Sequence, residues 1–138
     1  MSAVNIKVNY HLCRLANGEW PILAVMDDRG GCQVTEFLES VDDAEGQKMW
    51  ARFGFTVDHS PPTNTEHFKP IHPKRGAFEF KTKHLRIFCF KDGKSIVCTH
   101  GLMKSRVKSY PTEEQKVMAE KDRYLASTVR KITDYEET

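Results

Sequence analysis

The sequence predicts an α+β protein with a helical hairpin, a small antiparallel sheet and a C-terminal helix. Three patterns in the 138 residues indicate this class. Apolar β-type runs flank an Asp92-Gly93 turn, apolar residues recur at a spacing of three and four between Cys32 and Phe53, and a helix-forming segment follows Pro111. With 39% hydrophobic residues, a chain of this length supports one domain with a real core and is too short for two.

The N-terminal segment is expected to add a strand or hairpin, at about residues 1–20, to a single domain over residues 1–138. Residues 5–12 alternate apolar and polar side chains, Asn17-Gly18 marks a turn, and residues 21–26 form a second apolar run. Adjacent aspartates and glycines then predict a loop over residues 27–31.

The helical hairpin is predicted from spacing. One helix carries four apolar residues on a single face, namely Val34, Phe37, Leu38 and Val41. A second helix begins at Asp42 or Asp43, either of which can cap it, and continues through Phe53, with Gly54 a candidate for its end. The proline-rich residues 58–73 are expected to form a long surface loop.

The predicted sheet consists of the runs FEF, LRIFCF and Ser95–Thr99. Asp-Gly between the last two indicates a type I′ hairpin turn, because its central positions need positive φ. Period-two alternation places Glu79, Lys81 and Lys83 together on a solvent face. A turn before Leu85 would let Arg86 join them, with Phe88 and Phe90 on the same side unless a helix covers these rings.

The C-terminal segment is predicted to be a helix over Thr112 to Arg130. Thr112 is a suitable N-cap, Glu113 and Glu114 fall in the first turn, and Tyr124 is expected in the core. Residues 131–138 are expected to be a frayed acidic tail.

Charge is unevenly distributed along the chain. Residues 69–108 hold 11 Lys and Arg against 2 acids, a net charge of +9, whereas residues 1–68 have a net charge of −5 and residues 109–138 of −2. This polarity favours a polyanionic partner. The alternative is a solvated surface that the acidic segments neutralise.

Several functional classes are disfavoured. No apolar run approaches the roughly 18 to 20 residues that span a bilayer, and no signal peptide is evident, so we expect a cytoplasmic protein without a membrane partner. The four cysteines form no CxxC motif, and a Cys89–Cys98 disulfide is not expected in that compartment. The spacing of His59, His67 and His72 is irregular, so we expect neither metal nor cofactor.

The order of motifs resembles the phage-derived branch of the RelE/HigB toxin superfamily. The resemblance rests on EFLESV, FKPI, FEFK, LRIFCF and THGLMK, followed by Lys108 and Pro111, and covers about residues 33–126. It implies a microbial ribonuclease-like fold, cleavage of mRNA on the ribosome and neutralisation by a cognate antitoxin. The chain departs from the pattern at Ser105, in a step to Pro111 that is one residue longer, and in residues 1–20.

Metal-free RNA cleavage needs a base for the 2′-hydroxyl proton, cations for the phosphorane and an acid for the leaving oxygen. Lysine can be the base if neighbouring cations lower its pKa. The predicted catalytic residues are Lys81, Lys83, Arg86, Arg106 and His100, and the predicted RNA-binding residues are Lys104, Lys108, His84 and Tyr110.

Each residue also has a simpler interpretation. Lys81 and Lys83 could protect an edge strand from aggregation, and His100 could hydrogen-bond a turn. The alternatives for the whole protein are a non-catalytic member that binds RNA or an antitoxin, a DNA-gyrase inhibitor on the same fold, or a phage interaction protein without a nucleic-acid role. The oligomeric state is not predicted.

Overall fold

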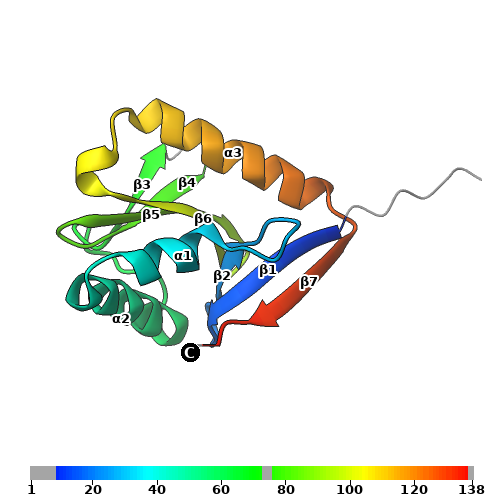
Figure 1. Ribbon diagram of the computed structural model, residues 1–138, viewed down its shortest axis with the longest axis horizontal. Helices are drawn as coiled ribbons and strands as arrows, with labels where there is room; N and C mark the ends of the chain where they lie inside the picture. Colours follow the sequence, from blue (N-terminus) through cyan, green and yellow to red (C-terminus); the bar gives the residue numbers. More distant parts are fainter. Residues whose placement is uncertain (1–8, 73–75, 137–138) are drawn as a thin grey trace, which may run out of the picture.

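The structure, a computed structural model, describes residues 9–72 and 76–136. A seven-stranded mixed sheet has the order β3-β4-β5-β6-β2-β1-β7. Helix α3 lies on one face, and α1 and α2 lie on the other (Figure 1). The elements are β1 Asn9–Ala16, β2 Ile22–Val25, α1 Gln33–Ser40, α2 Asp43–His59, β3 Phe68–His72, β4 Ala77–Lys81, β5 Leu85–Asp92, β6 Ser95–Met103, the 3₁₀ turn η1 Lys104–Arg106, α3 Tyr110–Ala126 and β7 Val129–Asp134.

The predicted α+β class is confirmed, but the sheet is larger than expected and is not purely antiparallel. The predicted meander, β4-β5-β6, is antiparallel. Strand β2 extends it by pairing parallel to β6, with Ile22 opposite Ile96, and β1 pairs parallel to β7. Local turn signals could not reveal these pairings, because they join segments far apart in sequence.

Both predicted hairpins are present. Strands β1 and β2 are antiparallel around the Asn17-Gly18 turn, with Leu12 opposite Val25. Strands β5 and β6 meet at the Asp-Gly turn, where Gly93 has a φ of 59°. The predicted type I′ turn is wrong, because Asp92 pairs with Ser95, so the central residues are Gly93 and Lys94, and of these two only Gly93 has a positive φ. The first part of the predicted N-terminal strand, residues 5–8, lies outside the described residues.

The helical hairpin is confirmed, with one boundary wrong. The Asp42 carboxylate caps α2 by accepting a hydrogen bond from the Ala44 amide at 3.0 Å. The helix does not end at Gly54 but continues to His59. Phe53 and Val57 both face the core, and their burial outweighs the roughly 1 kcal/mol that glycine costs in a helix.

The predicted loop over residues 58–73 ends in a strand. Strand β3 pairs antiparallel with β4, and the buried Phe68 ring packs on Phe78 and Phe80. Pro70 lies in this strand because β3 is at the edge of the sheet, where one missing amide hydrogen bond is tolerated.

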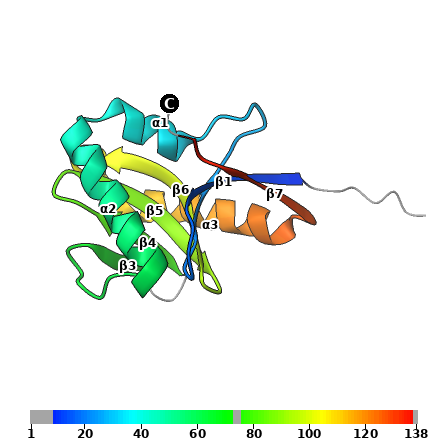
Figure 2. The ribbon, with the colours of Figure 1, turned by 90° about the horizontal axis from the view of Figure 1, so that it is seen from below.

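The C-terminal prediction needs three corrections, the first of which is that the helix ends at Ala126 and not at Arg130. Helix α3 begins at Tyr110, not Thr112, since Ser109 is the N-cap and its hydroxyl accepts from the Thr112 amide at 3.4 Å. Residues 129–134 form β7 rather than a frayed tail, and Figure 2 shows β7 beside β1 at the edge opposite β3. Parallel pairing to β1 supplies the backbone hydrogen bonds of this largely exposed segment.

Two hydrophobic clusters lie on either side of the sheet. Leu85 and Ile87 face α1 and α2, whereas Phe88 and Phe90 lie under α3 with Val117. Because α3 covers this face of the sheet, the rings of Phe88 and Phe90 are buried and not exposed to solvent. Tyr124 is buried in this second cluster, as predicted.

Two further expectations concern a disulfide between Cys89 and Cys98 and a segment that spans a membrane. All four cysteines are buried with free thiols, and Cys89 lies opposite Cys98. Over residues 9–72 and 76–136, every helix is too short or too polar to cross a bilayer.

Candidate functional site

A basic pocket of about 380 Å³ opens where the β4–β5 turn approaches α2, the loop before β3 and the end of β6. Five of its eight lining residues are cationic, against one acid. The lining residues are Arg52, Glu66, His67, Lys81, Thr82, Lys83, Arg86 and Lys104. Four residues predicted for the site, Lys81, Lys83, Arg86 and Lys104, therefore lie around one opening.

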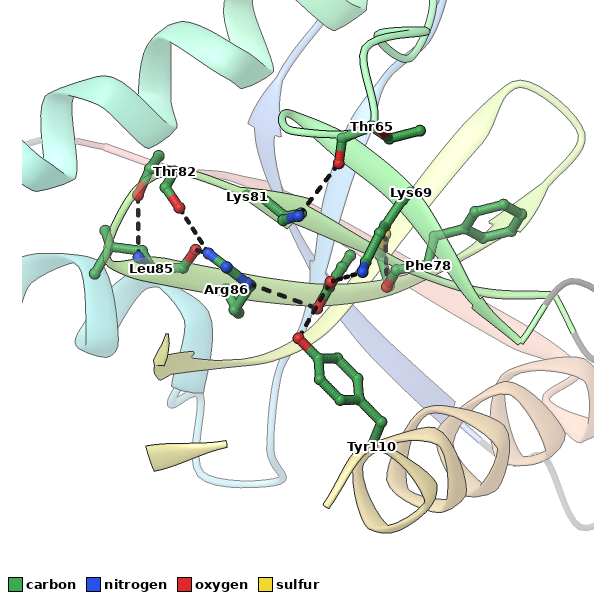
Figure 3. Close-up of polar contacts among 10 residues, drawn as sticks. Thr65, Lys69, Phe78, Lys81, Thr82, Leu85, Arg86 and Tyr110 are labelled. Atoms are coloured by element: carbon green, nitrogen blue, oxygen red, sulfur yellow. Dashed lines mark hydrogen bonds and ion pairs between the residues drawn. The ribbon is translucent and has the colours of Figure 1, made fainter. Parts of the chain in front are cut away.

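Arg86 is held rigidly at the inner wall of this pocket. It lies opposite Lys81 in the β4–β5 ladder, so the predicted common face is confirmed for these two residues, whereas Lys83 lies in the turn after β4 and not on the face of the strand. The predicted solvent exposure is wrong, because Arg86 is only 4% exposed. One guanidinium nitrogen, Nη1, donates to the carbonyl oxygens of Thr82 at 2.6 Å and Leu85 at 2.8 Å. The β4–β5 turn thus orients the guanidinium (Figure 3).

A buried carboxylate, Glu79, lies behind the pocket. Its oxygens are 3.8 Å from Lys69 Nζ and 3.9 Å from Arg86 Nε, and the Tyr110 hydroxyl donates to it at 3.3 Å. Burial raises the pKa of Glu79, and the nearby Arg86 and Lys69 charges partly offset this. Figure 3 shows Lys69, Arg86 and Tyr110 directed towards one region from three different elements.

The predicted solvent face for Glu79 is therefore wrong. The alternation of side-chain direction along β4 was correctly predicted, since Glu79 and Lys81 do share one side of this strand. However, this side of the sheet is covered by the beginning of α3, which brings Tyr110 against it. Period-two patterning cannot tell which face a distant helix will cover.

Lys81 combines partial burial with neighbouring cations. Its ammonium donates to the Thr65 carbonyl oxygen at 3.3 Å. The pKa of Lys81 is lowered by burial first, and then by the Lys69 and Arg86 charges, while Glu79 opposes the shift. A lysine in this setting is neutral more often than a solvated lysine, which suits it to accept a proton.

The other predicted RNA contacts are more exposed. Lys83 lies at the rim of the pocket, and His84 beside it accepts the Lys104 amide through its backbone oxygen at 2.7 Å. Arg106 and Lys108 are exposed in and after η1, and neither lines the basic pocket. Tyr110 lies behind the pocket, with its hydroxyl on Glu79 rather than at the opening.

His100 is not brought to the pocket. Its ring stacks on Phe88 at 4.8 Å, its Nδ1 lies 2.8 Å from Thr99 Oγ1, and its Nε2 lies 2.9 Å from Glu113 Oε1. Burial lowers the pKa of His100, and Glu113 opposes this shift. In this position His100 connects β6 to α3 and does not line the basic pocket.

Sequence reasoning missed six residues in or behind the pocket, namely Arg52, Glu66, His67, Lys69, Glu79 and Thr82. Lys69 and Glu79 belong to the highly charged segment, and Glu79 is one of only two acids there, which was an available signal. Arg52 and His67 lie outside the predicted sheet. Arg52 reaches the site because α2 packs on β4, where its Nε donates to the Lys81 carbonyl oxygen at 3.2 Å. No sequence pattern indicates that contact.

Among residues 9–72 and 76–136, no three His, Cys, Asp or Glu side chains gather in a way that could hold a metal ion.

Comparison with known proteins gives one match. The chain matches the model of the family described as phage-derived protein Gp49-like (DUF891) over residues 36–122. This span includes most of α1, all of α2, the strands β3 to β6 and the whole basic pocket. No curated protein and no solved structure matches the chain. Because the match covers more than half of the sequence, the chain belongs to the phage-derived Gp49-like family.

Proposed function

We propose that the chain is the toxin of a type II toxin–antitoxin system and acts as a ribosome-dependent mRNA endonuclease that needs no metal. The basic pocket carries the proposal, because five cationic side chains surround one opening that includes a lysine of lowered pKa. Membership of the Gp49-like family and the resemblance to the RelE/HigB superfamily support the same function.

The proposed reaction is attack by a ribose 2′-hydroxyl on the adjacent phosphorus. Neutral Lys81 accepts the hydroxyl proton as the new bond between the 2′-oxygen and phosphorus forms. The bond between phosphorus and the 5′-oxygen then breaks, leaving a 2′,3′-cyclic phosphate. The departing 5′-oxygen takes a proton, for which Lys83 at the rim is our candidate donor.

The transition state carries extra negative charge on the phosphoryl oxygens. Arg86 suits its stabilisation, because the two backbone carbonyls hold the guanidinium in place before the substrate arrives. Lys104 adds a second cation from the end of β6. Losing one such preorganised contact typically lowers the rate by roughly a hundredfold to a thousandfold.

The proposed partners follow from the same function. The mRNA on the ribosome would be the substrate, and a cognate antitoxin encoded with the toxin would neutralise it. The basic pocket is the surface that such an antitoxin must cover or distort.

The test is expression of the wild-type chain in bacteria, with primer extension on a message with and without its initiation codon. We expect growth arrest and cleavage only of the translated message. Lys81→Arg keeps the charge but removes the base, so cleavage should fall by about 10² to 10⁴. Lys131→Ala is the matched control, because this exposed lysine is on β7, at the edge of the sheet opposite β3.

Other outcomes assign other functions. Cleavage of free RNA would contradict ribosome dependence. A DNA-damage response with intact mRNA would indicate gyrase inhibition, and RNA or antitoxin binding without cleavage would indicate a non-catalytic member.

A further inference from the structure

A second pocket, of about 410 Å³, adjoins the basic pocket. It lies between the C-terminal part of α2 and the loop that follows, and its walls are mainly apolar. Arg52 and His67 line both pockets, so the two pockets are neighbours that share these residues. We call it the Phe55 pocket, after the aromatic residue in its wall.

Phe55 presents a ring to solvent, which is unusual for a large apolar side chain. It is 49% exposed, and its ring stacks on His59 with centroids 4.5 Å apart and an angle of 12° between planes. His59 Nδ1 lies 3.0 Å from the Phe55 carbonyl oxygen, which can only accept, so Nδ1 carries the proton and donates. This hydrogen bond holds the two rings face to face as a stacked platform of two aromatic layers.

The loop beneath this platform is held in an unfavourable backbone conformation. Ser60 ends α2 with φ 102° and ψ 165°, a region that is normally occupied by glycine. Among residues 9–72 and 76–136, it is the single non-glycine residue with positive φ. This conformation turns the chain directly from His59 into the two prolines, Pro61 and Pro62, of the pocket wall. Backbone strain of this kind persists where the surroundings impose it, and it is concentrated at binding sites.

We propose that the Phe55 pocket binds one unpaired base of the RNA whose phosphate lies in the basic pocket. This inference rests on the proposed function and specifies how the same site holds its substrate. Single-stranded RNA is commonly held by aromatic rings that stack on bases and by cations that contact the adjacent phosphates. Arg52 lies at the junction of the two pockets, where it can reach the phosphate between them.

A polar group is available for the edge of the base. Asn64 lines the Phe55 pocket, and its Oδ1 accepts the Glu66 amide at 2.9 Å. With Oδ1 used in this way, the Nδ2 group is the part of Asn64 that can donate to a base. Stacking would supply affinity, and this donor would supply limited preference among bases.

An apolar segment of a protein partner is the main competing occupant. Charge and proximity favour RNA, because the neighbouring pocket is lined by five cations and one acid, Glu66. A pocket that binds an apolar peptide segment would not need a cationic pocket beside it.

The experiment measures binding of a short 2′-O-methylated RNA, which cannot undergo 2′-hydroxyl attack, by fluorescence anisotropy. Phe55→Ala should weaken binding by about tenfold to a hundredfold, the effect of losing one stacked base. Phe55→Trp should retain the affinity. Leu125→Ala is the matched control, because Leu125 is a similarly exposed apolar residue, at 56%, on α3. Thermal melts of each variant test the fold.

A second arm uses oligonucleotides that lack one base at successive positions. For the wild type, removing the base that occupies the pocket should weaken binding as much as Phe55→Ala does. The Phe55→Ala variant should bind this oligonucleotide and the complete one equally. Its dependence on salt should match that of the wild type, since the phosphate contacts remain.

The outcomes separate this inference from the proposed function. If wild type and Phe55→Ala bind equally, or if wild type cleaves translated mRNA without binding the probe, the base site is wrong and the nuclease stands. If Phe55→Ala keeps its RNA affinity but escapes neutralisation by an antitoxin, the pocket belongs to a protein partner and the base site is wrong. If the wild type neither binds the probe nor cleaves translated mRNA, both proposals are wrong.

Discussion

Glu79 and Arg86 face each other inside the protein, with Oε2 and Nε 3.9 Å apart. Both atoms are shielded from solvent, and neither has a hydrogen-bond partner among the described residues. Arg86 is instead hydrogen-bonded through Nη1 to the two turn carbonyls. The pair therefore balances charge behind the basic pocket while the turn sets the direction of the guanidinium.

We predict that Arg86→Ala destabilises the fold as well as removing activity. Without Arg86, the Glu79 carboxylate loses its nearest compensating guanidinium, and breaking a buried ion pair in this way costs about 3–5 kcal/mol. Urea unfolding measures the change. The double variant Glu79→Gln, Arg86→Met removes both charges and should recover most of the lost stability without restoring cleavage. Equal destabilisation of the single and double variants would contradict the pairing.

The Glu79 carboxyl should make stability depend on pH. Its raised pKa means that the folded chain holds this proton more tightly than the unfolded chain does. The stabilisation is present below the ordinary value of 4.5 and is lost as pH rises through the folded pKa. Glu79→Gln should remove this loss, so the difference in unfolding free energy between variant and wild type should grow with pH over that window. A difference that is independent of pH would show that Glu79 titrates normally.

Lys104 should contribute one phosphate contact. Each neutralised phosphate adds a slope of about 0.7 to the log–log dependence of single-stranded binding on salt. Lys104→Ala should lower the slope for the 2′-O-methylated RNA by about that amount, and Lys131→Ala on β7 should leave it unchanged. If Lys104→Ala has the same slope as the wild type, Lys104 does not contact a phosphate of the bound RNA.

Gly101 should be intolerant of a side chain. A Cβ at this position would lie 2.5 Å from Phe37 Cδ2 and 2.6 Å from Ile87 Cδ1, because α1 packs closely over β6. We expect Gly101→Ala to destabilise the fold by about 1–3 kcal/mol. Gly54→Ala is the matched control, since a Cβ there meets nothing within 4 Å and the helix should gain about 1 kcal/mol. Thermal unfolding of the two variants should shift in opposite directions.

His100→Gln should keep toxicity while changing the response to acid. The pKa of His100 is lowered in the folded state, so the unfolded chain binds its proton more readily. Stability should therefore fall as pH drops from the ordinary value of 6.5 through the folded pKa, and the variant should lose this component. If a well-folded His100→Gln protein no longer cleaved mRNA, His100 would belong to the active site, as the sequence predicted.

Local sequence patterns were sufficient for elements whose signals lie within a few residues. The hairpin at Asp92-Gly93, though not its turn type, the cap at Asp42 and the alternation along β4 were each predicted correctly. The segment of high positive charge likewise indicated where the basic pocket would be, since four of its cations come from that segment. In these cases the backbone preference or the charge is a property of the residues themselves and does not depend on partners distant in sequence.

The tertiary structure alone decided which groups meet. Arg52 and His67 join the pocket from α2 and the loop before β3, and Tyr110 brings the beginning of α3 over Glu79. That cover buries a face predicted to be exposed, and burial raises the pKa of Glu79, while partial burial and neighbouring cations lower the pKa of Lys81. Likewise, β7 becomes a strand because β1 offers an unpaired edge. Burial and strand pairing depend on partners distant in sequence, so no local pattern contains them.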